Sequence, residues 1–291
     1  MSYAYYPGCS LKGMGRSYEE SLLATFRALG LCLDEIDDWN CCGATAYMSV
    51  DEDKAIALAA RNLAIAEPAG KDLVVPCSAC YLVLEKTRKH MREYPDTRKR
   101  VCSALEGAGL RYGETARIRH PLEVLFQDVG VEGLKKAVKR PLKGVKVAPY
   151  YGCQIVRPFS NFDHQVYPVV MDRLLEACGA EVVYYPLKTR CCGGSLTGTI
   201  EEAGQRLAYI LLHEAEKRGA NVVATLCPLC QFNLDSYHES ITRRFGQVSV
   251  PTVYFTQLVG YALGCSYEEL GLGRHRVPAR AALEGAETVA A

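Results

Sequence analysis

The sequence has no excess of charge of either sign, because 34 Lys and Arg residues face 33 Asp and Glu residues and leave a formal net charge of +1. Without a basic stripe, nucleic acid is not an expected partner. The sequence also lacks long apolar runs, since stretches such as Leu258–Leu263 are far too short to span a bilayer. No basic segment followed by an apolar one opens the chain, so no secretory signal is predicted and a cytoplasmic location is expected.

What the chain has in abundance is cysteine, with 14 among 291 residues. In the cytoplasm thiols stay reduced, so this number indicates metal ligation or redox chemistry before disulfides. The rest of the composition is ordinary for a globular protein, with 49% hydrophobic and 23% charged residues. The length is comfortable for two domains, each with a core of normal size.

The sequence contains an internal repeat, because three signatures of the first half recur in the same order in the second half. The matching segments are Tyr3–Cys9 and Val147–Cys153, Trp39–Gly43 and Thr189–Gly193, and Leu73–Cys80 and Val222–Cys230. In both halves 33 residues separate the Cys-Cys-Gly segment from the Cys-x-x-Cys segment. A common order and a common spacing argue for two halves with one ground plan.

Helical and extended patterns alternate within each half. Apolar residues recur at helical spacing over the ranges 18–29, 51–66, 166–177 and 201–217. Short β-branched pairs at 74–75 and 222–223 precede the Cys-x-x-Cys segments, and these open further helices over 81–92 and 231–241. The predicted fold class is α/β, with two pseudo-symmetric halves, each a mainly parallel sheet flanked by helices. We expect a first domain over residues 1–140, a second over 145–275, and a C-terminal tail over 276–291.

Ten of the cysteines fall on the repeat, five in each half. The first set is Cys9, Cys41, Cys42, Cys77 and Cys80, and the second set is Cys153, Cys191, Cys192, Cys227 and Cys230. Thiolates are the usual protein ligands of iron–sulfur clusters, and a Cys-x-x-Cys at a helix start places two sulfurs near free backbone N–H groups. Gly43 and Gly193 are expected to let the backbone turn sharply beside the cluster. A cubane cluster or a structural zinc takes four cysteines, so five indicate a spare thiolate or a cluster of unusual shape.

Two other roles compete for these cysteines. Disulfides fit poorly, because a vicinal Cys-Cys pair closes only with strain and the compartment is reducing. Zinc in one or both sites is the stronger alternative, since zinc also binds Cys-x-x-Cys. The four cysteines outside the repeat are predicted to be buried core residues: Cys32, Cys102, Cys178 and Cys265.

The repeated cysteine pattern resembles the cysteine-rich CCG domain, and two complete copies resemble the B subunit of heterodisulfide reductase. The similarity extends to Lys139–Cys153, which is similar to the linker of that family, and to Val253–Gly260, which is similar to its C-terminal segment. It covers residues 1 to about 273.

This resemblance implies that each set of five cysteines holds one non-cubane [4Fe–4S] cluster, so that the ten cysteines form the catalytic site as cluster ligands. It implies a catalytic subunit that cleaves or forms a disulfide, which in methanogen members is that of coenzyme M with coenzyme B. The implied partners are a ferredoxin-like iron–sulfur protein, the C subunit of such complexes, and their flavin-containing A subunit, with a small thiol or disulfide as substrate. The alternative is an electron-relay or docking subunit for a quinone-linked succinate, fumarate, lactate or glycolate flavoenzyme.

The segments before the two Cys-Cys-Gly motifs differ in charge. Asp37 and Asp38 precede the first, whereas Lys188 and Arg190 precede the second. The basic flank is expected to raise the potential of the second cluster or to attract an acidic substrate group, with Lys188 or Arg190 orienting an anionic thiol fragment. A solvated or cluster-neutralising charge is the alternative. His120 and His164 are expected to be structural, and Tyr5, Tyr6, Tyr150 and Tyr151 are expected to pack beside the clusters.

Overall fold

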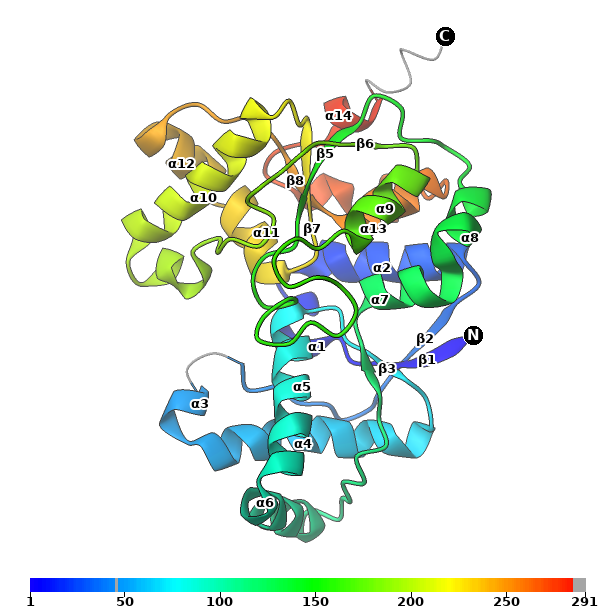
Figure 1. Cartoon of the computed structure of the whole chain (residues 1–291), viewed down its shortest axis with the longest axis vertical. Coiled ribbons are helices and arrows are strands. Elements are labelled where there is room, and N and C mark those ends of the chain that lie inside the picture. The colour runs from blue at the N-terminus through cyan, green and yellow to red at the C-terminus, as the bar shows by residue number, and fades with distance from the viewer. Residues whose placement is uncertain (45–46, 285–291) are drawn as a thin grey trace. The chain divides into compact units, whose positions relative to one another are not determined.

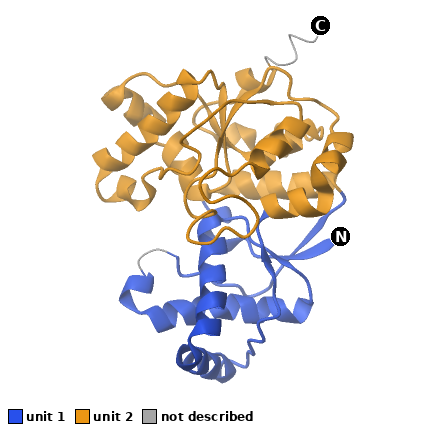
Figure 2. Cartoon of the chain, in the orientation of Figure 1, with its two compact units in different colours: residues 1–13, 30–121 blue, residues 14–29, 122–291 orange. Residues whose placement is uncertain are grey.

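The structure, a computed structural model, describes residues 1–44 and 47–284. It divides into two compact units, one formed by residues 1–13 and 30–121 and the other by residues 14–29 and the chain from residue 122 onward (Figure 2). Each unit holds one four-stranded sheet, so the predicted α/β fold with two similar halves is confirmed. The prediction that the first repeat ends at residue 140 and the second begins at residue 145 stays a prediction.

The first unit is built on a parallel sheet with the strand order β2-β1-β3-β4 (Figure 1). Its strands are β1 (Ser2–Tyr5), β2 (Cys32–Glu35), β3 (Leu73–Val74) and β4 (Ile118–Arg119). Its helical elements are α1 (Gly8–Leu11), α3 (Tyr47–Val50), α4 (Glu52–Ala66), η1 (Glu67–Ala69), α5 (Ser78–Glu93) and α6 (Pro95–Gly107).

The second unit repeats this arrangement with the strand order β6-β5-β7-β8, again all parallel. Its strands are β5 (Lys146–Tyr150), β6 (Glu181–Val182), β7 (Val222–Thr225) and β8 (Thr252–Tyr254). Its longer helices are α2 (Arg16–Ala28), α8 (Gly130–Ala137), α9 (Val170–Ala177), α10 (Glu201–Lys217), α11 (Pro228–Asp235), α12 (His238–Phe245) and α13 (Phe255–Ala262). Its shorter helical elements are α7 (Pro121–Val124), η2 (Leu125–Val129), η3 (Gly194–Gly198), η4 (Leu272–Arg274) and α14 (Arg280–Glu284).

Helix α2 lies between β1 and β2 in the sequence but packs in the second unit. Its Ser21 hydroxyl lies 2.6 Å from the hydroxyl of Thr256 on α13, and Thr25 donates to the Thr256 carbonyl at 2.9 Å. All three side chains are fully buried, so their hydroxyls need partners inside the protein. Sequence periodicity identified this helix but could not assign it to a unit.

The strand register brings the cysteine-bearing loops to the same edge of each sheet. In the first unit Tyr5, the last residue of β1, pairs with Val74, the last residue of β3. In the second unit Tyr150 at the end of β5 pairs with Thr225 at the end of β7. Because parallel strands end at one edge, the loops that follow them meet there, as at ligand sites of other α/β sheets.

The predicted helices agree with the structure where a clear start signal is present. Asp51 caps α4 by accepting a hydrogen bond from the N–H of Lys54 at 3.0 Å, and the helix ends at Ala66 as expected. Two predictions were partly wrong. The helix expected over 166–177 begins only at Val170, and the one expected over 231–241 is split into α11 and α12 around Ser236 and Tyr237.

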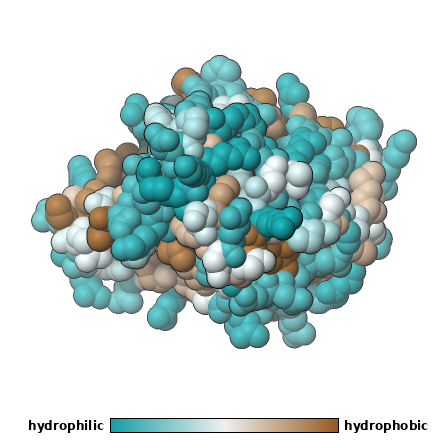
Figure 3. Space-filling model, turned by 90° about the horizontal axis from the view of Figure 1, so that it is seen from below, coloured by the Kyte–Doolittle hydropathy of each residue, from teal (hydrophilic) through white to brown (hydrophobic). Residues whose placement is uncertain are grey.

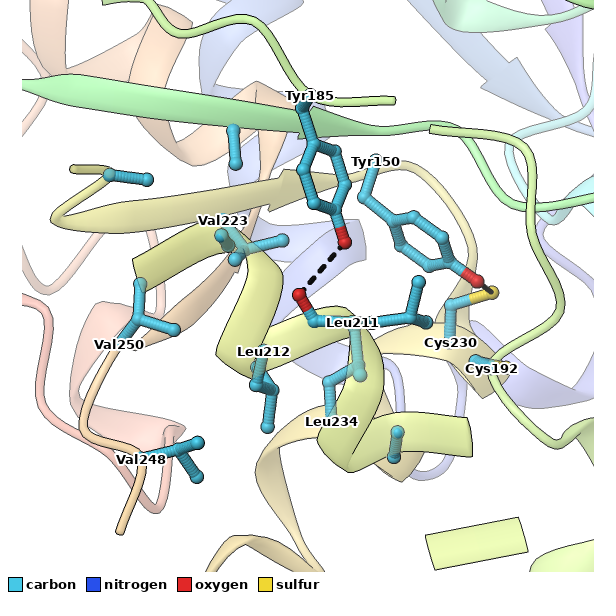
Figure 4. Close-up of a cluster of buried hydrophobic side chains, with 14 of the residues drawn as sticks. Tyr150, Tyr185, Cys192, Leu211, Leu212, Val223, Cys230, Leu234, Val248 and Val250 are labelled. Carbon is cyan, nitrogen blue, oxygen red and sulfur yellow. Dashed lines mark hydrogen bonds between the residues drawn. The ribbon is translucent and has the colours of Figure 1, made fainter. Parts of the chain in front are cut away.

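The second unit has a hydrophobic core that includes three cysteines of the repeat. Figure 4 shows Tyr150, Tyr185 and aliphatic side chains such as Leu211 and Leu212 in this core, with Cys192 and Cys230 at one side near Tyr150, and Cys227 belongs to the same cluster. The buried Tyr185 hydroxyl is satisfied by donating to the Leu211 carbonyl at 2.9 Å. On the face that Figure 3 presents, hydrophilic residues predominate and hydrophobic ones form small separate groups.

Candidate metal centres

The five cysteines of the first set come together in the first unit from three segments. Cys9 lies on α1, Cys41 and Cys42 lie in the loop after β2, and α5 brings Cys77 at its N-cap and Cys80 in its first turn. The sulfurs of Cys9 and Cys41 are 3.9 Å apart, and those of Cys42 and Cys80 are 3.2 Å apart. Cys77 and Cys80 are joined by a hydrogen bond between their thiols. The first predicted set is therefore gathered at one place.

The second set is gathered in the same way in the second unit. Cys153 follows β5, Cys191 and Cys192 follow the loop after β6, and α11 brings Cys227 at its N-cap and Cys230 in its first turn. Cys230 forms hydrogen bonds with Cys192 and with Cys227. Burial raises the pKa of the Cys153 thiol, and the nearby sulfurs of Cys192 and Cys227 raise this pKa further.

Burial follows the same pattern in both sets. Three members of each are buried, namely Cys42, Cys77 and Cys80 in the first set and Cys192, Cys227 and Cys230 in the second. The other two are accessible, because Cys9, Cys41 and Cys191 are exposed and Cys153 is half-buried. A group bound by all five thiols would thus be anchored in the core and reachable from solvent at one side.

A glycine lies against a buried cysteine in each unit. Gly8 has φ +68°, and a Cβ there would lie 3.0 Å from the Cys80 sulfur. Gly152 has φ +72°, and its Cβ would lie 3.1 Å from the Cys230 sulfur. Only glycine combines this conformation with such a close approach. The sequence prediction assigned a sharp turn and a close approach to Gly43 and Gly193. Both have the positive φ of such a turn, +77° and +102°, but the nearest neighbours of a Cβ at those positions belong to helices α4 and α10. The missed signal is the Gly-Cys pair that both halves share.

A buried tyrosine fixes the residue before each Cys-Cys pair. The Tyr6 hydroxyl donates to the Asn40 carbonyl at 2.8 Å, and the Tyr150 hydroxyl donates to the Arg190 carbonyl at 2.7 Å. Burial raises the pKa of both phenols, and the neighbouring thiols raise the pKa further, so both phenols stay neutral. Both rings are fully buried, as expected for packing beside the cysteines.

In each set the pKa of the second thiol of the Cys-Cys pair is strongly lowered. Hydrogen bonds from the thiols of Cys41 and Cys80 lower the pKa of Cys42 to about 4. Hydrogen bonds from the thiols of Cys191 and Cys230 lower the pKa of Cys192 to about 3. The same hydrogen bonds raise the pKa of the donors. A hydrogen bond with Cys80 lowers the pKa of the buried Cys77 as well. Each set therefore contains sulfurs whose anionic form is favoured, which suits a cationic centre.

The loop before each Cys-Cys-Gly motif is held by different contacts in the two units, a side chain in the first and backbone hydrogen bonds in the second. In the first unit the buried Asn62 accepts from the N–H of Asn40 at 2.9 Å and donates to its carbonyl at 3.0 Å. In the second unit the Lys188 carbonyl accepts from the N–H groups of Tyr151 and Gly152, at 2.9 and 3.0 Å. These contacts tie the Cys-Cys loop to its unit, and no local sequence pattern marks Asn62 for this role.

Lys188 and Arg190, the two predicted substrate-binding residues, have different surroundings. Lys188 is 1% exposed, and its ammonium group pairs with Asp172 and donates to the Pro168 carbonyl at 2.9 Å. Asp172 also accepts from the Tyr151 hydroxyl at 2.7 Å. Arg190 is exposed. The ammonium of Lys188 is thus committed to an internal ion pair, whereas the side chain of Arg190 reaches solvent.

The remaining predicted residues have structural surroundings. His120 is buried, with its Nε2 2.9 Å from the carbonyl of Pro76, and His164 accepts from two backbone N–H groups through its Nδ1. Of the four cysteines outside the repeat, Cys178 is buried as predicted, whereas Cys102 and Cys265 are half-buried and Cys32 is exposed. The core assignment is wrong for Cys32, because β2 is an edge strand whose side chains are mostly exposed.

The chemistry of the side chains in each site suits an iron–sulfur group, because thiolates are the usual protein ligands of such groups. Within residues 1–44 and 47–284, no three His, Cys, Asp or Glu side chains surround a point at which one metal ion could bind.

Known proteins share both the cysteine-rich repeat and the length of the chain. The family model described as "CCG: Cysteine-rich domain" matches residues 3–85 and again 147–235. A protein of Wolinella succinogenes, the 8-methylmenaquinol:fumarate reductase membrane anchor subunit, is 34% identical over 95% of this chain and 97% of its own length. The B subunit of the ferredoxin/F420H2-dependent CoB-CoM heterodisulfide reductase of Methanosarcina acetivorans is 31% identical over 86% of this chain and 88% of its own length. A protein of Archaeoglobus profundus, described as similar to the heterodisulfide reductase B subunit, is 33% identical over 93% of both chains.

The fold and the two cysteine sets thus define a protein with two CCG domains. Within that class, the chain belongs to the B-subunit family of heterodisulfide reductase. A crystal structure of a hypothetical protein from Helicobacter pylori shares the fold, with a TM-score of 0.78 at 15% identity over 95% of this chain and 52% of that chain. None of the helices in the described part of the chain has the length and apolarity to cross a membrane.

Proposed function

We propose that the chain is the iron–sulfur subunit of a heterodisulfide-reductase-like complex, in which it cleaves or forms a disulfide at two [4Fe–4S] clusters. Cys9, Cys41, Cys42, Cys77 and Cys80 would hold one cluster, and Cys153, Cys191, Cys192, Cys227 and Cys230 the other. When bound, the clusters would supply electrons to the disulfide and accept its sulfurs at iron. The observation that carries the proposal is the same gathering of five thiols in both units.

The fifth thiol of each set supports a non-cubane cluster, because a cubane uses four. The burial pattern supports access of a small substrate, since three thiols anchor the group in the core while the other two reach solvent. Partners of the kinds found in such complexes, a ferredoxin-like iron–sulfur protein and a flavoprotein, belong to this proposal, as does a cytoplasmic location.

Arg190 is the side chain that best suits the recognition of an anionic substrate. It is exposed and directly precedes Cys191, the exposed member of the Cys-Cys pair. Lys188 would contribute by holding the loop through Asp172. Arg190→Gln should raise the substrate KM and leave kcat and the urea midpoint unchanged. Arg244→Gln, which removes an exposed arginine on α12, serves as the matched control.

A second function is favoured by the relative from Wolinella succinogenes, which is part of a fumarate reductase that uses a menaquinol. In that case the two clusters would relay electrons between a quinone-linked flavoenzyme and its partner, without binding a thiol. The same cysteines would be needed, so cysteine variants do not distinguish the two functions.

The distinguishing experiment is spectroscopy of the anaerobically purified protein. Iron and sulfide are measured first, and electron paramagnetic resonance spectra are then recorded with and without coenzyme M, coenzyme B and their mixed disulfide. A signal that appears or changes with a thiol supports catalysis at a cluster. A cluster spectrum that ignores every thiol and disulfide contradicts the first function and leaves the relay. Zinc without iron or sulfide would overturn both.

A matched pair of variants shows that the spectrum comes from the proposed ligands. Cys227→Ser removes a buried thiol of the second set, and Cys178→Ser removes a buried thiol that lies outside both sets. We expect the first variant to lose the iron of one site, whereas the second keeps all of it. Equal loss in both would count against the ligand assignment.

A further inference from the structure

The two cysteine sites differ at one position of the Cys-x-x-Cys helix, which is fully buried in the second unit and half-buried in the first. Residues of the two halves correspond at a constant offset of 150 from the Cys-Cys pair to the Cys-x-x-Cys helix, so Asn233 corresponds to Val83. Asn233 is 0% exposed and lies one turn after Cys230 on α11. The first unit therefore has an apolar side chain where the second has an amide.

The amide of Asn233 contacts a cysteine sulfur. Its Nδ2 lies 3.4 Å from the sulfur of Cys192 and 3.0 Å from the carbonyl of Gly194. An amide NH2 carries two hydrogens, so it can donate to both acceptors at once. Val83 has no donor, so the corresponding sulfur in the first unit, that of Cys42, receives no hydrogen bond from this position.

The neighbours of the amide fix which end faces the sulfur. The hydroxyl of Thr197 lies 2.9 Å from the Asn233 Oδ1 and can donate to it. Rotating the amide by half a turn would place Oδ1 against the Gly194 carbonyl and the Cys192 sulfur, which are both acceptors. Because Asn233 is fully buried, water cannot compensate for such a mismatch, and the NH2 end therefore faces Cys192.

Formal charges around the two sites differ in the same direction. In the second unit the Arg157 guanidinium donates to the Thr189 carbonyl and lies close enough to Cys153 to attract a thiolate. In the first unit the loop that carries the Cys-Cys pair contains Asp38, whose carboxylate pairs with Arg61. The second site is thus surrounded by more uncompensated positive charge.

We propose that Asn233 raises the reduction potential of the cluster bound by the second cysteine set above that of the first, so that electrons collect at the second site. The inference rests on the two clusters of the proposed function. A cluster gains one negative charge when it is reduced, and an N–H donor directed at a ligand sulfur stabilises that charge. Asn233 acts through the sulfur of Cys192, a proposed cluster ligand, and does not touch the substrate, so it is a positioning residue and not a catalytic one.

Three variants test this role of Asn233. Asn233→Leu has nearly the same shape without a donor, and Asn233→Asp keeps an acceptor for Thr197 but directs a carboxylate oxygen toward Cys192. The reciprocal Val83→Asn offers a donor to the first site. Gln205→Leu is the matched control, because Gln205 is an equally buried amide of the second unit whose side-chain hydrogen bonds go to Glu201 and Ser240.

The measurement is a redox titration of the anaerobic protein followed by electron paramagnetic resonance, with iron and sulfide determined for each variant. In Asn233→Leu one midpoint should fall by about 59 mV, which for one electron is about a tenfold change in the equilibrium constant of reduction. The other midpoint should stay unchanged. Asn233→Asp should lower the same midpoint further, and Val83→Asn should raise the other one. Gln205→Leu should move neither midpoint.

Unchanged midpoints in an Asn233→Leu protein with full iron would overturn the inference, as would equal shifts of both midpoints. If Asn233→Leu fails to assemble, Thr197→Val keeps the amide but removes the hydroxyl that orients it, and the same midpoint should fall by a smaller amount. An unchanged midpoint in Thr197→Val would then overturn the inference. Failure of the thiol response, with these shifts intact, would refute only the disulfide chemistry of the proposed function.

Discussion

Replacing Gly152 with alanine, and comparing the variant with a control at another glycine, distinguishes two effects: contact of the added Cβ with a cysteine sulfur and strain in the backbone. Gly152 has φ +72°, and its added Cβ would lie 3.1 Å from the Cys230 sulfur. Gly219 lies in the same unit, has φ +81° and has open space around its Cβ position. Gly219→Ala therefore imposes the strain of a left-handed alanine without touching a cysteine.

The expected magnitudes follow from these two geometries. A left-handed conformation costs a residue with a Cβ about 1–2 kcal/mol, so both variants should lose that much free energy of unfolding. In Gly152→Ala the Cys230 sulfur must also shift by a few tenths of an ångström. Cys230 is fixed in the first turn of α11 and is buried, so the shift should disturb the geometry of the second site alone.

The assay compares urea unfolding with iron and sulfide content after anaerobic reconstitution. With the two proposed [4Fe–4S] clusters, the iron content of Gly152→Ala should fall from about 8 to about 4 per chain, whereas Gly219→Ala should keep all of its iron despite a similar loss of stability. Gly8→Ala, with its Cβ 3.0 Å from the Cys80 sulfur, should remove the other cluster. Equal iron content in Gly152→Ala and Gly219→Ala would refute the reasoning.

Three further predictions concern the second unit. Lys188→Met leaves the nearly buried Asp172 carboxylate without its cation and should cost about 3–5 kcal/mol of unfolding free energy, most of which the double variant with Asp172→Leu should restore. Burial raises the pKa of Asp235, but the nearby His275 imidazole and hydrogen bonds from the backbone N–H groups of Arg276 and Val277 outweigh it and lower the pKa below its usual value. The stability that this carboxylate contributes is therefore complete above the ordinary aspartate pKa and is lost as the pH falls below that value. Asp235→Asn should flatten the pH dependence of the urea midpoint between about pH 5 and pH 2. Burial raises the pKa of the Cys178 thiol to about 12, so iodoacetamide at pH 8 should label it only in unfolded protein, as peptide mass spectrometry can show.

The sequence carried enough information to predict the cysteine sets, because their spacing is repeated and their residue type is chemically specific. It predicted the helices whose ends are marked, such as α4 with its Asp51 cap and α10 at Glu201–Lys217. It could not predict that α11 ends at Asp235, where the carboxylate accepts from the N–H groups of Arg276 and Val277. Such contacts join segments about 40 residues apart and leave no local pattern.

By itself the sequence determined the α/β class, the two-fold repeat and the ten thiols, since periodicity, order and spacing are properties of the chain alone. Only the tertiary structure decided which neighbours each thiol has. Parallel pairing of β1 with β3 and of β5 with β7 gathers the five sulfurs of each set, and packing places Gly152 and Asn233 against two of them. The physical reason is that burial and hydrogen bonding depend on residues distant in sequence, which differ between the halves although the cysteines do not.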